Sequence, residues 1–139
     1  GMPQTVGSVG VKYSSQRYWW AGVNVNYFDD IYLDINPERR TAEAISGFSS
    51  DDYRVGKALD QEELGEGFTL DLFAGKSWRL KGNYYIGLSL NVNNLLNVQD
   101  LAIGGFEQLR YDPANPDKFP AKYIYMFGTQ YFINVNFRM

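Results

Sequence analysis

The sequence predicts an all-β fold, an antiparallel meander of about five long strands. Apolar and polar residues alternate with a period of two along several segments, which is the side-chain alternation of an extended chain. The composition agrees, because the 139 residues include 11 Tyr, 9 Phe, 3 Trp and 14 Gly, and aromatic side chains are enriched in strands.

The connections between the predicted strands alternate between short and long. Tight hairpins join the first strand to the second and the third to the fourth, whereas residues 35–67 and 98–121 form long loops. Both long loops therefore leave the sheet at one end, and both hairpins lie at the other. The predicted strands are residues 5–13, 17–34, 68–80, 84–97 and 122–138, all within one segment, residues 1–139.

The length of the strands is unusual for a water-soluble domain. Residues 17–34 would span roughly 60 Å at about 3.3 Å per residue, whereas strands of globular domains commonly span about 20 Å. Long strands, short turns at one end and long loops at the other are typical of an outer-membrane β-barrel.

One face of the strands is predicted to contact lipid. The opposite face carries Asn, Ser and Gly in place of the charges usual on a solvent face, together with Phe73, Tyr85 and Phe132. Lys76 departs from the pattern, because it falls on the apolar side. The residues predicted to face lipid are Trp19, Val23, Tyr27, Trp78, Tyr84, Leu88, Val92, Tyr131, Val135 and Phe137.

A soluble fold is the alternative interpretation. Alternation alone does not distinguish lipid-facing from core-facing side chains. The same apolar residues could therefore line the pocket of a soluble ligand-binding β-barrel or β-sandwich.

The composition argues against several classes of function. Cys and His are absent and the net charge is −3 without a basic cluster, so thiolate chemistry, histidine general bases and nucleic-acid binding are not expected. The start of the chain has neither a basic nor an apolar region of a signal peptide, and no apolar run reaches the length of a transmembrane helix. We expect no enzyme, no cofactor and no metal site.

Acidic residues gather in the first long loop, where they would most often be solvated. The pairs Asp29–Asp30 and Asp51–Asp52 could bind calcium, but the spacing is not that of an EF-hand. A secreted hydrolase with a carboxylate pair from Asp30, Asp34 and Glu38 is a third reading, although nothing in the sequence fixes their separation. Ligand-binding residues are left unassigned. The charged residues of this loop include Glu38, Arg39, Arg40, Glu43, Asp51, Asp52, Asp60, Glu62, Glu63 and Glu66.

Several segments resemble the C-terminal part of TonB-dependent outer-membrane receptors. The most specific are the NNLLN stretch at 93–97 and GGFEQLRYD at 104–112, and the terminal strand at 127–139 is similar as well. The segments at 18–28 and 36–41 add to the likeness. The resemblance is greatest to the branch that carries an N-terminal carboxypeptidase-regulatory-like domain.

The resemblance implies a nutrient transporter in the outer membrane. Members of this family are 22-stranded barrels around a plug, and they import iron chelates (siderophores), cobalamin or glycans with energy from the TonB complex. About five strands cannot close such a barrel, so the resemblance implies a fragment of a large transmembrane β-barrel. Its partners would be outer-membrane lipid and the rest of the barrel. In isolation the fragment is expected to curl or self-associate, because its apolar face and both edge strands would be uncovered.

Overall fold

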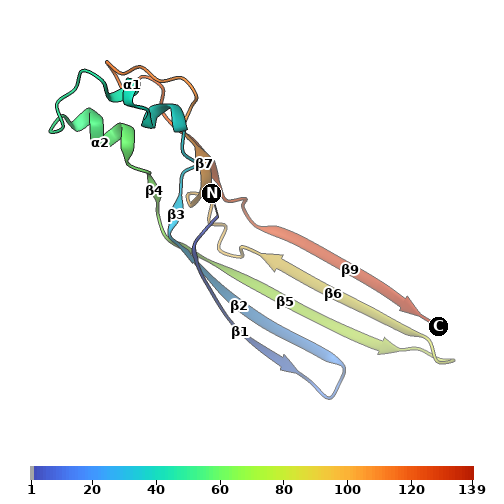
Figure 1. Cartoon of the computed structure of the whole chain (residues 1–139). Coiled ribbons are helices and arrows are strands. Elements are labelled where there is room, and N and C mark those ends of the chain that lie inside the picture. The colour runs from blue at the N-terminus through green and yellow to red at the C-terminus, as the bar shows by residue number, and fades with distance from the viewer. Residues whose placement is uncertain (1) are drawn as a thin grey trace. The chain divides into compact units, whose positions relative to one another are not determined.

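The computed structural model describes residues 2–139, and its largest element is a five-stranded antiparallel sheet (Figure 1). The strand order is β1-β2-β5-β6-β9, so each strand lies beside its predecessor in the meander. The predicted meander is therefore confirmed, as an open sheet with β1 and β9 at its edges in the described residues. The strands are β1 (Thr5–Ser14), β2 (Trp19–Asp29), β5 (Gly67–Arg79), β6 (Tyr85–Asn93) and β9 (Gln130–Arg138).

The register gathers the apolar residues on one face of this sheet. Residues directly opposite each other in an antiparallel pair share a face. Apolar side chains therefore form rows that cross β2, β5, β6 and β9, and Lys76 interrupts one row, as the sequence predicts. The rows are Val23–Leu72–Val92–Tyr131, Ala21–Ala74–Leu90–Ile133, Trp19–Lys76–Leu88–Val135 and, without β2, Trp78–Ile86–Phe137.

The other long segments of the chain are not unstructured, in contrast to the expectation for residues 35–67 and 98–121. Together with the residues that flank them, they form two small hairpins and three short helices. The hairpins pair β3 (Ile31–Tyr32) with β4 (Glu63–Leu64) and β7 (Ala102–Phe106) with β8 (Lys122–Tyr125); the helices are η1 (Pro37–Arg40), α1 (Ala42–Ile45) and α2 (Tyr53–Leu59). None of the helices in residues 2–139 is long and apolar enough to cross a membrane.

Three of the predicted strands have different ends in the structure. The predicted strand 17–34 is interrupted at Asp30, whose φ is 53°, and the chain continues as β3 in another sheet. The predicted strand 84–97 ends at Asn93 because Asn94 has a φ of 52°. The predicted strand 122–138 is two strands, β8 and β9, in different sheets.

The described chain divides into two compact units. We call residues 6–28, 67–100 and 126–139 the sheet unit, and residues 2–5, 29–66 and 101–125 the loop unit. The loop unit holds most of the buried apolar side chains, including Ile31, Leu33 and Ala58, whereas Val92 is the buried one in the sheet unit. Buried apolar side chains are thus concentrated in the loop unit.

Candidate functional site

The apolar face of the sheet unit is largely uncovered. Nine of the ten residues predicted to face lipid are exposed, from Val23 at 37% to Tyr131 at 72%. Val92 is the exception at 4%, and it lies opposite Leu72 on one side and Tyr131 on the other. A face of this kind is too apolar to be an ordinary water-exposed surface.

Aromatic side chains line the hairpin end of this face. The rings of Tyr13 and Trp19 are 5.4 Å apart, and those of Tyr84 and Phe137 are stacked at 5.7 Å. The Lys76 ammonium lies 5.6 Å from the ring of Trp78. An apolar ring with a polar edge, or a long stem with a terminal charge, suits the boundary between an apolar layer and water.

The opposite face combines amides with aromatic rings laid across glycines. Phe73 shares a row with Gly22, Asn91 and Phe132, which agrees with its predicted position on the polar side. A Cβ on Gly22 would overlap the ring of Phe73. The absence of a side chain there is therefore what lets the ring pack against the neighbouring strand.

A chain of hydrogen bonds crosses this polar face. The Ser8 hydroxyl donates to the side-chain oxygen Oδ1 of Asn26, and the side-chain nitrogen Nδ2 of Asn26 donates to Asp71 at 2.7 Å. The other oxygen of Asp71 accepts from the backbone N–H of Asn94. The network joins β1, β2, β5 and the end of β6 through uncharged amides and a single carboxylate.

The NNLLN stretch holds the start of β9 against the end of β6. Asn94 is buried, and its side-chain amide donates to the carbonyls of Val98 and Phe127 at 2.8 Å each. Its side-chain oxygen accepts from the N–H of Val98, while Asn97 accepts from the N–H of Thr129. These asparagines therefore have a structural role in the sheet unit.

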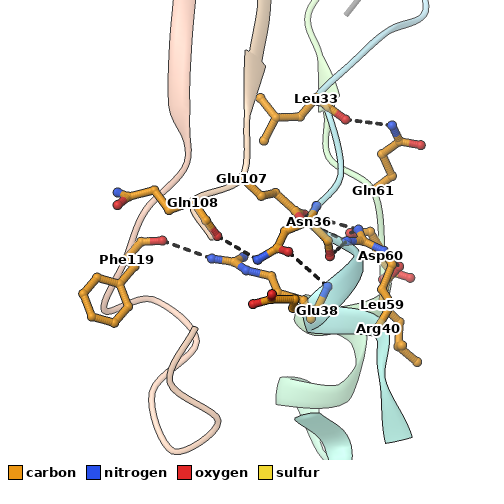
Figure 2. A network of polar contacts seen from close by, with 11 residues as sticks. Leu33, Asn36, Glu38, Arg40, Leu59, Asp60, Gln61, Glu107, Gln108 and Phe119 are labelled. Atoms are coloured by element: carbon orange, nitrogen blue, oxygen red, sulfur yellow. Dashed lines mark hydrogen bonds and ion pairs between the residues drawn. The ribbon is translucent and has the colours of Figure 1, made fainter. Parts of the chain in front are cut away.

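The GGFEQLRYD stretch supplies Glu107 and Gln108 to a network of polar contacts in the loop unit (Figure 2). The Glu107 carboxylate accepts from the backbone N–H of Asn36 at 2.7 Å and from two nitrogens of Arg40 at 2.8 and 3.2 Å. The remaining donors of Arg40 bond the carbonyls of Asn36, Leu59 and Asp60, so all five of its N–H groups have partners.

Two opposing effects set the pKa of Glu107. Burial favours the neutral acid, but the hydrogen bonds from Arg40 and from Asn36, together with the charges of Arg40 and Arg39, outweigh it. The pKa of this carboxyl is therefore lowered, and Glu107 is ionised at neutral pH.

A cavity of about 500 Å³ lies in the loop unit beside this network. Its wall includes Arg39, Asp60, Glu62, Phe119 and Tyr123. Arg39 is only 7% exposed, and its Nη2 donates to the Phe119 carbonyl at 3.1 Å. Its Nε is buried without a hydrogen-bond partner, although the guanidinium lies 5.4 Å from the ring of Tyr111.

The acidic residues that the sequence suggested for calcium binding or hydrolysis lie in several separate parts of the structure. Carboxylate oxygens of Asp29, Asp30 and Glu63 lie within 4.8 Å of one another, a proximity that the sequence did not predict for Glu63. Asp52 is bound by Arg54 at 2.6 Å, which lowers the pKa of Asp52 to about 2 through side-chain and backbone hydrogen bonds. Glu38 lies in η1, and Asp34 bridges to Phe106 through its backbone.

Sequence reasoning missed the helices and the Arg40–Glu107 pair. One signal was present: Asn36 caps η1 by accepting from Glu38, and Pro37 occupies its first turn, a common helix start. Asp52 caps α2 in the same way. No local pattern indicates that Glu107 meets Arg40, because 67 residues separate them.

No protein-family model, no curated protein and no solved structure matches this chain.

Proposed function

We propose that this chain is the C-terminal part of an outer-membrane TonB-dependent receptor that takes up a nutrient. The observation that carries the proposal is the exposed apolar face of the sheet unit, which the strand register assembles from four strands. Lipid is the solvent that such a face suits, because leaving a large apolar side chain in water costs about 1.5 to 3 kcal/mol.

The dimensions of the face support this proposal. A membrane-spanning β-strand needs about 9 to 11 residues, and the alternation from Trp19 to Tyr27 covers nine. The aromatic residues at the hairpin end would then lie at one membrane boundary, where the Lys76 ammonium can reach water. The amide-rich face would line the interior of the barrel.

The remaining parts of the proposal follow from the open sheet. The edge strands β1 and β9 would pair with the rest of the receptor barrel, since unpaired strand edges promote association. The chain would act without a catalytic step or cofactor of its own. Its nutrient would be a siderophore, cobalamin or a glycan, as the family resemblance implies.

The three tryptophans allow a direct test with an internal control. Trp19 and Trp78 lie on the apolar face, whereas Trp20 shares the polar face with Gly75. Single-tryptophan variants of the whole chain would be reconstituted in phosphatidylcholine vesicles that contain brominated lipid. We expect stronger fluorescence quenching of Trp19 and Trp78 than of Trp20.

Two results would contradict the proposal. Equal quenching of all three tryptophans would show that the apolar face does not select lipid. A stable monomer in detergent-free buffer, with Trp19 shielded from aqueous iodide, would favour the soluble alternative with a private apolar pocket. Self-association of the chain in that buffer, measured by size exclusion with light scattering, is the expected result.

A further inference from the structure

The cavity of the loop unit contains a buried cation whose bonding is incomplete. Arg39 is more than nine-tenths buried, and neither its Nε nor its Nη1 has an acceptor in the described part of the chain. Of the two, Nε is shielded from solvent, whereas Nη1 keeps accessible surface. Among the described residues it forms no ion pair, unlike Arg40, whose donors are all used. Buried charges are normally paired, because an isolated ion loses its hydration without compensation. The position beside Arg39 therefore suits an anionic oxygen.

The neighbouring carboxylates of this cavity cannot fill that position as they stand. Glu107 lines the cavity, but its oxygens are already bonded to Asn36 and Arg40. Asp117 is paired with Lys57 at 2.6 Å. An external carboxylate could accept from Nη1 of Arg39, in the way that arginine commonly recognises carboxylates.

Two acids on the rest of the wall have the opposite charge preference, and the other cation that the structure describes on this wall, Lys57, is paired with Asp117. Asp60 and Glu62 both line the cavity, and neither forms an ion pair within residues 2–139. Glu62 accepts a hydrogen bond from the Tyr123 hydroxyl at 2.8 Å, which fixes its carboxylate beside an aromatic ring. These two acids would repel a second anionic group and attract an ammonium group.

We infer that this cavity binds a small zwitterion with a carboxylate and an ammonium group, of the class of amino acids and short peptides. The carboxylate accepts from Arg39, and the ammonium lies toward Glu62 and Asp60. The volume of about 500 Å³ lies within the range of small-molecule sites, about 300 to 1,000 Å³. The binding site lies wholly in the loop unit, so the inference goes beyond the proposed function and does not require that the sheet contact lipid.

Capped dipeptides separate the two charge contacts. Binding to the whole chain in detergent would be measured by calorimetry with L-alanyl-L-alanine, its N-acetyl form and its C-terminal amide. We expect the free dipeptide to bind, and each cap to weaken binding about tenfold or more, the value of one charge-assisted hydrogen bond. Two compounds serve as controls: inorganic phosphate is an anion without an ammonium group, and maltose is a neutral polyol.

Two conservative variants assign each contact to its residue. Arg39→Lys should weaken binding of the free dipeptide but leave binding of the C-terminal amide unchanged, because the amide has no carboxylate. Glu62→Gln retains an acceptor for Tyr123. It should weaken binding of the free dipeptide but leave binding of the N-acetyl form unchanged, because that form has no ammonium group. Asp51→Asn, which removes an exposed acid outside the cavity wall, should change nothing.

Three outcomes would overturn the inference. They are no dipeptide binding at millimolar concentration, capped forms that bind as tightly as the free dipeptide, and phosphate or maltose binding that is lost in Arg39→Lys. Amide exchange of the loop unit would verify that each variant is folded. The lipid-quenching measurement is independent, so failure here leaves the transporter proposal standing, and the reverse also holds.

Discussion

Replacing Glu107 by Gln should destabilise the loop unit by about 3 kcal/mol. The Glu107 side chain is 5% exposed and that of Arg40 is 18% exposed, so the pair is largely removed from water. Gln keeps the shape but presents an NH₂ group where one carboxylate oxygen now accepts from Arg40. Removing one partner of a buried pair costs about 3 to 5 kcal/mol, and Gln retains part of the acceptor.

Hydrogen exchange would measure this change within the loop unit. The N–H of Asp34 bonds the Gly105 carbonyl, and the N–H of Glu107 bonds the Asp34 carbonyl, both at 3.0 Å. A loss of 3 kcal/mol corresponds to exchange about 150-fold faster at both amides, if local opening limits exchange.

The controls separate the buried pair from a general effect of charge. Glu43→Gln removes an exposed acid of α1 and should change stability by less than about 0.5 kcal/mol. Replacing both partners, Glu107→Leu with Arg40→Met, should recover part of the loss, because neither member of the pair is then left as a buried charge without the other, although the Asn36 N–H loses its acceptor. Unchanged exchange in Glu107→Gln would refute the view that this pair organises the loop unit.

Three further results are expected. Asn94→Ala removes three side-chain hydrogen bonds and an asparagine suited to positive φ, so the sheet unit should lose about 3 kcal/mol in urea unfolding. Gly75→Ala places a Cβ against the Trp20 indole and should cost about 1 to 3 kcal/mol, with a shift in tryptophan fluorescence. Because the pKa of Glu107 is lowered on folding, its stabilisation is present above about pH 4.3 and is lost as the pH falls through the folded value, as a carboxyl-carbon NMR titration would show.

Neighbouring residues provide controls for the two substitutions in the sheet unit. Asn93→Ala changes an exposed asparagine of β6 and should have little effect. Gly7→Ala in β1 meets no atom within 4 Å and should be neutral or stabilising. If Gly75→Ala were as well tolerated as Gly7→Ala, the close packing of Trp20 on Gly75 would not matter for the sheet.

Alternation in the sequence predicted the sheet because strand geometry has a period of two. Val23, Leu72 and Tyr131 could be assigned to one face from their positions alone, and the register puts them in one row. The strand ends were harder to predict, because they depend on single residues with positive φ. Asp30 and Asn94 are permitted there, but nothing obliges an aspartate or asparagine to adopt that conformation.

The loop unit was beyond prediction for a different reason. Its helices are too short to produce a periodic pattern, and only the caps at Asn36, Thr41 and Asp52 mark them. The cavity and the incomplete bonding of Arg39 depend on contacts with Phe119 and Tyr111, which are distant in the sequence. Such contacts follow from how the segments pack, and the charges alone do not specify them.

The sequence by itself determined the strands, their meander order and the apolar side of each, because these follow from local geometry and from short hairpins. Only the tertiary structure decided that the two long connections fold together and that Glu107 takes Arg40 while Arg39 is left with a free donor. The physical reason is that burial and pairing of charges are properties of the packed chain, set by which distant residues exclude water from one another.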